Sequence, residues 1–434
     1  MVPLLVFVGA CKTSTPATEE IPPTVPITIA VAGDTLLTRP VDPRDAGIAG
    51  VRDLMRGAAL AFVNLNVNIL EETPPAAAPE QASWPFARPR DAAALRDLGV
   101  GVVSLANDHA ADYGAAGLAA TRRALARAGL LDVGAGPDLA AARRPVLIGR
   151  SADGRARVAI VALATSSASG SRATASRADI GRPGLNPLRY AADITADPKT
   201  FQTLAEKAAA AGGSPGTRQA AETISLFGTT IRRGERTAIQ FLVDSRDERE
   251  ILDTIAAAHR DAEFVIVSLH SHEPANASAE PADFVRLFAR RAIDAGAHAV
   301  VGHGPHRLRG VEAYRGGLIL YSVGDFVSQA ADVAPGGANA FDAGADLNAL
   351  TLGGAAAPRP AAPSSETASL AVLLDFFEGT LARARLEPLE LGREGTPIVA
   401  GPEKRAEILE TLRRLSAPGT RIRADGAVAE VALH

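Results

Sequence analysis

The stretch "ITIAVAGD" (Ile27–Asp34) is a short, β-branched, continuous apolar run that ends in Gly-Asp. Such a run is typical of a strand that is buried on both faces of a sheet. Six similar runs follow it: ALAFVNLN (Ala59–Asn66), GVGVVSLAND (Gly99–Asp108), RVAIVALAT (Arg157–Thr165), EFVIVSLH (Glu263–His270), AHAVVGH (Ala297–His303) and GLILYSVGD (Gly317–Asp325). The sequence therefore predicts several buried strands within one core.

Helical segments lie between several of these runs. Gly114–Leu130 and Pro281–Gly296 carry apolar residues at positions i, i+3, i+4 and i+7, with arginines on the other face. Strands that alternate with helices indicate an α/β protein. We expect Arg189–Arg236 to be mainly helical and to form an insertion or a lid.

The C-terminal part has a different composition. Residues 330–369 are rich in Ala, Gly and Pro without periodicity, which predicts a flexible loop. Leu370–Leu391 predicts a hairpin that turns at Glu378-Gly379. A helix over Pro402–Leu415 and a short strand are expected to complete the domain in residues 370–434.

Length and charge limit the class of protein. A chain of 434 residues suits one large domain with additions, or two domains. Hydrophobic residues make up 47% of it, enough for a sizeable core. The net charge is −4 and no segment is dense in Lys and Arg, so we expect no nucleic-acid partner.

Cys11 is the single cysteine, so no intramolecular disulfide can form. The apolar segment before it ends in Val8-Gly9-Ala10-Cys11, which resembles a bacterial lipobox, although the usual basic n-region is missing. A Thr/Pro/Glu-rich spacer follows up to residue 26. We expect residues 1–26 to be a lipoprotein signal and tether, with Cys11 lipidated and the protein anchored in the cell envelope on the extracytoplasmic side. The alternative is an apolar N-terminal stub.

Polar side chains follow most of the predicted strands, at the point where each strand ends. In open α/β sheets, ligands bind beyond the carboxyl ends of the strands. A single Asp or His after a strand is more often a cap or turn residue. Five strands, however, deliver such residues here: Asp34, Asn66, Asn107, Asp108, His109, His270, His272, His303 and His306.

These residue types indicate a metal site. Imidazole, carboxylate and amide oxygen together suit Zn, Mn or Fe rather than Ca or Mg alone. The number of candidate ligands makes a centre with one or two divalent transition-metal ions plausible. Two-metal centres activate a water and stabilise a displacement at phosphorus or carbonyl carbon.

The order of these motifs resembles the CapA family of capsule and poly-γ-glutamate synthesis proteins. The resemblance rests on Gly33-Asp34, Phe62–Leu65, Ser104–Leu118, Gly134–Pro145, Val267–His270 and Asp294–Phe326, and it covers residues 27–327 together with the C-terminal hairpin. It implies a calcineurin-like metallophosphatase fold, an αββα sandwich, over residues 27–329. It further implies that Asp34, Asn107, His270, His303 and His306 are metal ligands and that His109 is the catalytic histidine.

The chain departs from the family pattern at five positions. Asn66 and Asp108 stand where members commonly have Glu and Asn, and both remain candidate ligands. The usual His-Trp-Gly is His270-Ser271-His272, and Asp325 replaces an Asn. We expect His272 to be a solvent-facing turn residue, with a compensating metal ligand as the alternative.

Three functions fit these features. The first is a metal-dependent hydrolase or transferase acting on an anionic cell-surface polymer or a phosphoester, in contact with a membrane synthase complex. The second is a non-catalytic scaffold that binds the polymer or the synthase through a degenerate site. The third is a periplasmic phosphoesterase unrelated to capsule, because a fold does not fix a substrate.

Overall fold

The computed structural model describes residues 26–71, 85–149, 154–167, 182–210, 222–226, 229–329, 368–392, 394–425 and 428–433. Cys11 and residues 330–367 of the expected loop lie outside this set. Among the helices of the described residues, none combines the length and the apolar character that a membrane crossing requires.

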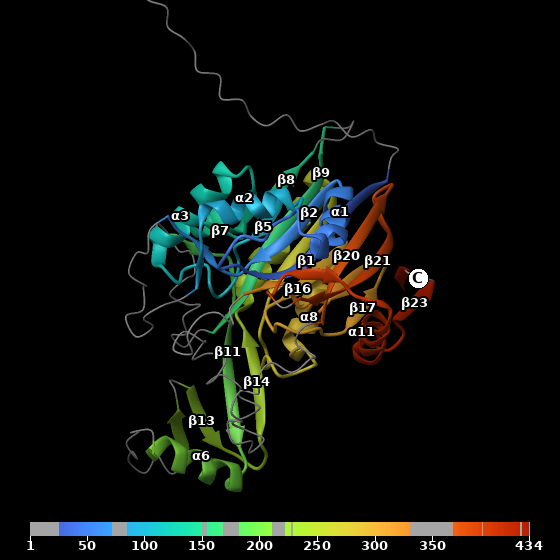
Figure 1. Cartoon of the computed structure of the whole chain (residues 1–434). Helices are drawn as coiled ribbons and strands as arrows, with labels where there is room; N and C mark the ends of the chain where they lie inside the picture. The colour runs from blue at the N-terminus through green and yellow to red at the C-terminus, as the bar shows by residue number, and fades with distance from the viewer. Residues whose placement is uncertain are drawn as a thin grey trace, which may run out of the picture.

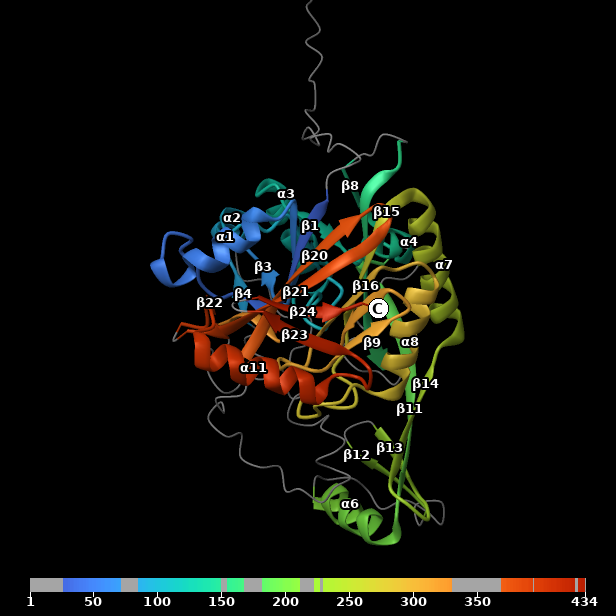
Figure 2. The same cartoon turned by 90° about the vertical axis from the view of Figure 1, so that its right-hand side faces the viewer.

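Two large sheets face each other in the body of the molecule (Figures 1 and 2). Sheet I has the strand order β23-β24-β21-β20-β1-β2-β5-β6, with β19 beside β1 and β22 beside β21. Its strands are β1 (Ile27–Leu36), β2 (Leu60–Leu65), β5 (Val102–Ser104), β6 (Leu131–Val133), β19 (Asp325–Ser328), β20 (Ala368–Phe377), β21 (Thr380–Leu391), β22 (Pro397–Val399), β23 (Arg421–Asp425) and β24 (Val428–Ala432).

Sheet II has the order β12-β13-β11-β9-β15-β16-β18-β17, with β14 beside β11 and β8 beside β9. Its strands are β8 (Val146–Ile148), β9 (Ala156–Ser167), β11 (Pro187–Ala196), β12 (Thr223–Leu226), β13 (Thr229–Arg233), β14 (Ala238–Val243), β15 (Ala262–His270), β16 (Ala299–His303), β17 (Val311–Tyr314) and β18 (Gly317–Leu320). Two short pairs join β3 (Asn68–Ile69) to β4 (Phe86–Ala87) and β7 (Ala135–Gly136) to β10 (Gly184–Leu185).

Alternate side chains of the central strands pack into two different hydrophobic cores. Ile29 and Val31 of β1 face the core between the sheets, where they join Ile160 and Ile266 of sheet II. Ala30 and Ala32 face the outer core that helices cover. This double burial explains why the strands read as continuous apolar runs.

Helices cover both outer faces, so the fold is the expected αββα sandwich. α1 (Ala49–Gly57), α2 (Pro89–Asp97) and α3 (Gly114–Arg127) lie on sheet I, while α4 (Leu139–Arg143), α7 (Ser245–Asp261) and α8 (Asp283–Asp294) lie on the side of sheet II. The 3-10 helix η1 (Ala46–Ile48) precedes α1. The predicted hairpin is β20–β21, which turns through Glu378 and Gly379 at φ 46° and 76°, and α11 (Pro402–Leu415) packs beside it.

The segment Arg189–Arg236 is an insertion, but it is not mainly helical in its described residues, where α6 (Pro198–Ala210) is accompanied by the strands β11, β12 and β13. The paired strands β11 and β14 project from the body, and α6, β12 and β13 lie at their far end (Figures 1 and 2). Ile194, Phe201, Leu204 and Ile231 form a small core there. In β11, Tyr190, Ile194 and Ala196 are buried while residues between them are more exposed, which is the period of a strand.

The run Gly317–Asp325 also differs from expectation, because it contributes to two sheets. β18 belongs to sheet II, and after Tyr321–Gly324 the chain enters sheet I as β19. Gly324 has φ 75°, a conformation that glycine adopts without steric cost. The crossing brings Asp325 beside Asp34 in the register of β1 and β19.

Candidate metal centre

The carboxyl ends of parallel strands from both sheets meet at one edge of the sandwich. β1, β2 and β5 run parallel in sheet I, and β9, β15, β16 and β18 run parallel in sheet II. β19, parallel to β1, begins at this edge with Asp325. The register pairs Asp34 with Asn64, and His270 with His303. Parallel pairing therefore collects residues from distant parts of the chain at this edge.

Asp34 occupies the middle of the site and is fully buried. One carboxylate oxygen accepts a hydrogen bond from Asn64 Nδ2 at 2.6 Å, and the other accepts from the Gly304 N–H at 2.8 Å. Burial opposes ionisation of Asp34, but the imidazoles of His303, His270 and His306 lower the pKa of this carboxyl below its ordinary value. Asp34 is therefore an anion facing several histidines.

The first group of potential ligands comprises Asp34, His306 and Asp325. His306 Nδ1 lies 2.8 Å from Asp325 Oδ1 and 3.7 Å from Asp34 Oδ2. His306 has φ 57°, which is unusual for a residue with a side chain and costs backbone energy. Burial raises the pKa of Asp325, against the influence of His306. The group thus holds two carboxylates of unlike proton affinity around one imidazole.

His303 is buried next to Asp34, and among the described residues neither of its ring nitrogens has a hydrogen-bond partner. Its Nδ1 lies 3.6 Å from Asp34 Oδ1. Burial lowers the pKa of His303 to about 4, against the attraction of Asp34. A buried polar atom without a partner carries a free-energy cost, so a neutral His303 with its lone pair open suits a cation that completes its contacts.

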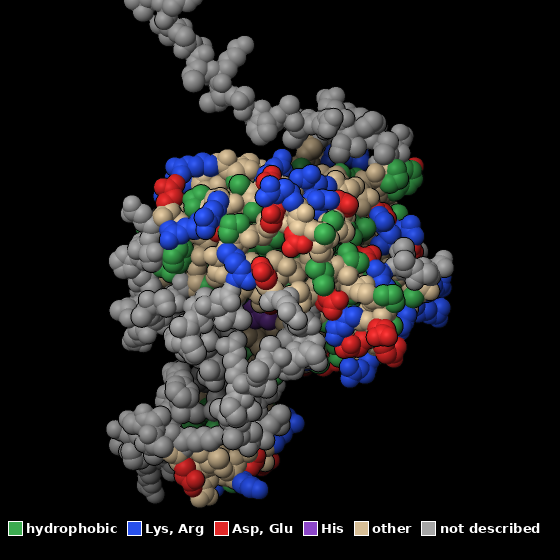
Figure 3. All heavy atoms as spheres, viewed as in Figure 1, with side chains coloured by type: hydrophobic (Ala, Val, Ile, Leu, Met, Phe, Trp, Pro, Cys, Tyr) green, Lys and Arg blue, Asp and Glu red, His purple; other side chains and the backbone are tan. Residues whose placement is uncertain are grey.

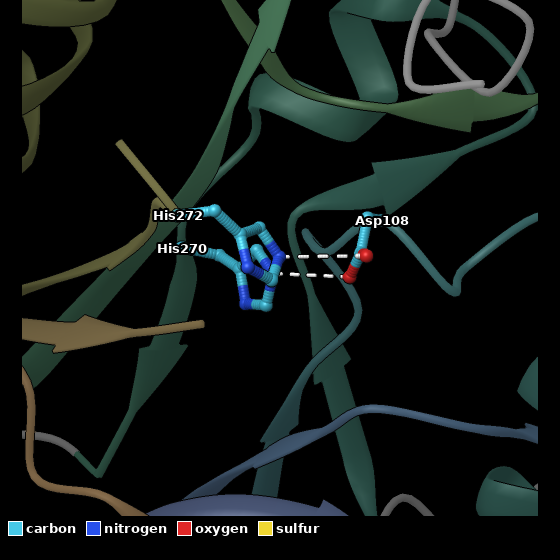
Figure 4. A group of neighbouring side chains, drawn as sticks. All are labelled: Asp108, His270 and His272. Carbon is cyan, nitrogen blue, oxygen red and sulfur yellow. Dashed lines mark hydrogen bonds and ion pairs between the residues drawn. The ribbon is translucent and has the colours of Figure 1, made fainter. Parts of the chain in front are cut away.

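The second group comprises Asp108, His270 and His272 (Figure 4). His270 Nε2 lies 3.1 Å from Asp108 Oδ1, and His272 Nε2 lies 3.4 Å from Asp108 Oδ2. Burial opposes the charge on Asp108, but His109 and His272, with hydrogen bonds from His270 and His272, lower the pKa of this carboxyl well below its ordinary value. His272 is 9% exposed, so the expectation of a solvent-facing turn residue was wrong.

His109 lies beside this group and is held by a carboxylate of its own. Its Nδ1 is 2.8 Å from Asp112 Oδ2, and its Nε2 is 3.7 Å from Asp108 Oδ2. An N–H donated from Nδ1 to Asp112 leaves Nε2 available for proton transfer. This pairing is the arrangement by which a carboxylate orients a general acid or base.

Three asparagines complete this edge in different ways. Asn64 connects the groups, since its Nδ2 also lies 3.2 Å from His270 Nδ1 and its Oδ1 accepts from Asn107 Nδ2 at 3.1 Å. Asn107 Nδ2 donates to Leu65 O as well, so this amide holds the strand ends together. Asn66 is 1% exposed, and neither atom of its amide has a hydrogen-bond partner among the described residues.

The structure thus brings together Asp34, Asn107, Asp108, His109, His270, His303 and His306, with Asn66 buried at the next strand end. The sequence patterns assigned no role to Asn64, Asp112 and Asp325. Asn64 and Asp325 both pair in register with Asp34. No pattern within one strand could have shown this, because register is set between strands that are distant in sequence. Asp112 stands three residues after His109, a spacing that predicts contact on a helical turn.

The site opens to solvent on one side. The side chains of Asp108 and His306 are 16% and 23% exposed, whereas that of Asp34 is 1% exposed. Figure 3 shows a small patch of histidine surface on the body, on the side from which the insertion projects. The donor set of carboxylates and neutral imidazoles, with the unpartnered nitrogens of His303, fits a divalent transition metal.

Comparisons with known proteins give a family match and several relatives. The family model "Bacterial capsule synthesis protein PGA_cap" matches residues 28–330. The chain is 32% identical to the uncharacterized protein y4sH of Sinorhizobium fredii, over 94% of this chain and 93% of that protein. It is 32% identical to a probable polyglutamine synthesis accessory protein of Mycobacterium tuberculosis, over 55% of this chain and 48% of that one. It is 28% identical to the PGA biosynthesis protein CapA of Bacillus subtilis, over 54% and 44%.

Proposed function

Because this chain belongs to the PGA_cap family of bacterial capsule synthesis proteins, we propose that it is a metal-dependent hydrolase or transferase that acts on a cell-surface polymer of the poly-γ-glutamate type or on a phosphoester. The observation that carries the proposal is the placement of an oriented general acid/base beside two groups of potential ligands. His109 Nε2 lies 3.7 Å from Asp108, which belongs to the second group.

Asp34, His306 and Asp325 would hold one cation, with His303 adjacent to it. A divalent ion bound there supplies Lewis-acid polarisation of the substrate and lowers the pKa of a coordinated water. The remaining chemistry belongs to the chain. Asp34 keeps its geometry through Asn64 and Gly304, so its carboxylate needs no rearrangement when a cation binds.

His109 moves the proton. Its Nε2 would take a proton from the attacking group or give one to the leaving group, while Asp112 fixes the ring and stabilises its charged form. A general acid or base contributes about 10²–10⁴-fold to a rate. Asp112 acts through His109 and is a positioning residue.

We also propose a location for this activity. The Val8-Gly9-Ala10-Cys11 sequence supports a lipid anchor at Cys11, with the protein in the cell envelope on the extracytoplasmic side. An anchored enzyme would meet the polymer as a membrane synthase complex delivers it. Relatives named for polyglutamine and PGA synthesis support the association with polymer synthesis.

The test uses the full chain loaded in turn with Mn²⁺, Zn²⁺ and Fe²⁺, with bis(p-nitrophenyl) phosphate and a γ-glutamyl oligomer as substrates. His109→Asn should lower turnover by about 10²–10⁴-fold at unchanged metal content. Asp112→Asn should shift the acid limb of the pH–rate profile, which a merely structural role would not do. His259→Gln, on α7 away from the site, is the matched control.

A metal-loaded protein that binds the polymer but turns over neither substrate would contradict the enzymatic proposal and favour the scaffold. Turnover of the phosphodiester with no action on γ-glutamyl polymer would favour a phosphoesterase unrelated to capsule. Each outcome therefore selects one of the three functions.

A further inference from the structure

His270 and His272 leave the same strand end and direct their rings toward Asp108 on the opposite sheet (Figure 4). Asp108 and His272 are two of the positions at which this chain departs from the pattern that it resembles. We propose that Asp108, His270 and His272 form a cation site of their own for a Zn²⁺-like ion, in which His272 is the ligand that completes the set. The proposal rests on the proposed function and specifies its second metal.

The separations of the three ligand atoms fit one ion. A tetrahedral ion with bonds of about 2.0–2.1 Å places its ligand atoms about 3.3 Å apart. His270 Nε2 and His272 Nε2 are 3.0 Å apart, and they lie 3.1 and 3.4 Å from the two oxygens of Asp108. All three side chains can therefore contact a single cation with small adjustments.

The tautomer of His272 is set by its other nitrogen. His272 Nδ1 lies 2.7 Å from Asn276 Oδ1, which accepts its N–H. In the neutral ring Nε2 then carries a lone pair, 3.0 Å from His270 Nε2 and 3.4 Å from Asp108 Oδ2. Metal-binding histidines commonly donate their second N–H in this way. Without a metal, this lone pair accepts the Nε2–H of His270 at 3.0 Å, because Asn64 Nδ2 donates to the other ring nitrogen of His270. A cation bound here would take the place of that proton.

The loop that carries His272 is held rigidly. Arg309 is 1% exposed and donates to four backbone carbonyls, those of His272, Glu273, Ala275 and Ser278. Glu273 accepts hydrogen bonds from the hydroxyls of Thr165, Tyr190 and Ser271. Loss of this support would let the ring move, so the loop pre-organises His272 as a ligand.

Asn66 cannot supply the charge of such a site because its side chain is a neutral amide. Asp108 supplies a negative charge at the same edge of the sandwich, and His272 adds a neutral metal-ligating nitrogen next to it. The remaining alternative is a single proton shared among the three side chains. The proton and the divalent ion differ in a quantity that can be measured directly, the metal content.

In the experiment, a chelator removes bound metal from the full chain and Zn²⁺ is then added back. Elemental analysis measures the number of ions per chain. Wild type and the His259→Gln control should bind about two ions. His272→Ala and Asp108→Asn should each bind about one, and Asp34→Asn should lose the other ion. Co²⁺ loading should give a tetrahedral absorption band that His272→Ala removes.

Asn276→Ala should weaken the second ion by about 10–100-fold, as loss of an outer hydrogen bond does. Circular dichroism checks that each variant folds, and His272→Gln serves if the alanine variant does not. Retention of the wild-type ion count in His272→Ala and Asp108→Asn would overturn this inference and leave the proposed function standing. A wild type that binds no ion would instead defeat the proposed function itself.

Discussion

The backbone N–H of Gly304 donates a 2.8 Å hydrogen bond to the carboxylate of Asp34, which stands 270 residues earlier in the chain. This bond joins the loop after β16 of sheet II to the end of β1 in sheet I. It also holds one carboxylate oxygen in place while His306 lies 3.7 Å away. The closure of the sandwich and the geometry of the metal centre therefore depend on the same contact.

The residue before Asp34 is Gly33, and the structure leaves no room for a side chain at this position. A Cβ on Gly33 would lie 1.8 Å from the carbonyl oxygen of Gly324, so the backbone of β1 or of the crossing must move. We expect Gly33→Ala to lower the free energy of unfolding by about 1–3 kcal/mol or more and to reduce metal content. Gly57→Ala is the control, because a Cβ there meets nothing within 4 Å. Equal thermal unfolding of the two variants would contradict this account.

His306 should be required for the first cation. It lies between Asp34 and Asp325 and is the imidazole of that group. His306→Ala should remove about one ion per chain, measured by elemental analysis after dialysis, because two carboxylates without the imidazole bind a transition metal less selectively. His259→Gln should keep the wild-type content. A full complement of metal in His306→Ala would exclude this group as a site.

The Asn66→Glu substitution should strengthen metal binding, but it should destabilise the fold when metal is removed. With metal present, the added carboxylate should raise the affinity for the second cation, because Asn66 is buried just beyond the end of β2 and its amide atoms have no hydrogen-bond partner among the described residues. After chelation, a buried unpaired carboxylate should destabilise the fold by about 3–5 kcal/mol. Melting curves with and without Zn²⁺ test this, with Asn66→Gln as the neutral control. A variant whose melting temperature ignores metal would place Asn66 outside the centre.

The metal-free chain should lose stability between about pH 6.5 and pH 4. Burial lowers the pKa of His303 to about 4 in the folded state, below the ordinary histidine value of about 6.5. Above pH 6.5 the residue is neutral in both states, and as the pH falls the unfolded chain takes up the proton first. The loss should approach about 3 kcal/mol. Urea unfolding at several pH values measures it, and His303→Gln should flatten the slope in this window. An unchanged slope would assign the pH dependence to other groups.

Cys11→Ser should move the protein from the membrane fraction to the soluble fraction. The variant keeps the size of the side chain but cannot carry the lipid that gives stable membrane binding. Fractionation of cells followed by immunoblotting measures the change, and Ser14→Ala, in the spacer just beyond the proposed lipidation site, is a matched control. Equal membrane association of Cys11→Ser and wild type would rule out the anchor.

The sequence by itself determined the central strands, the α/β class and the C-terminal hairpin. Runs such as Ile27–Asp34 and Glu263–His270 lie within β1 and β15 because burial on both faces demands an uninterrupted apolar stretch. The residues at the strand ends could also be predicted, since parallel strands direct their carboxyl ends to one edge. These properties depend on neighbours in sequence, which a pattern can show.

The tertiary structure alone decided how those strand ends meet. The crossing from β18 to β19 places Asp325 beside Asp34, and the loop held by Arg309 buries His272 against Asp108. The projecting strands β11 and β14 likewise form because each finds the other as a partner, although residues 197–237 separate the end of one from the start of the other. Such contacts depend on register and packing between distant segments, and no local periodicity encodes their free energy.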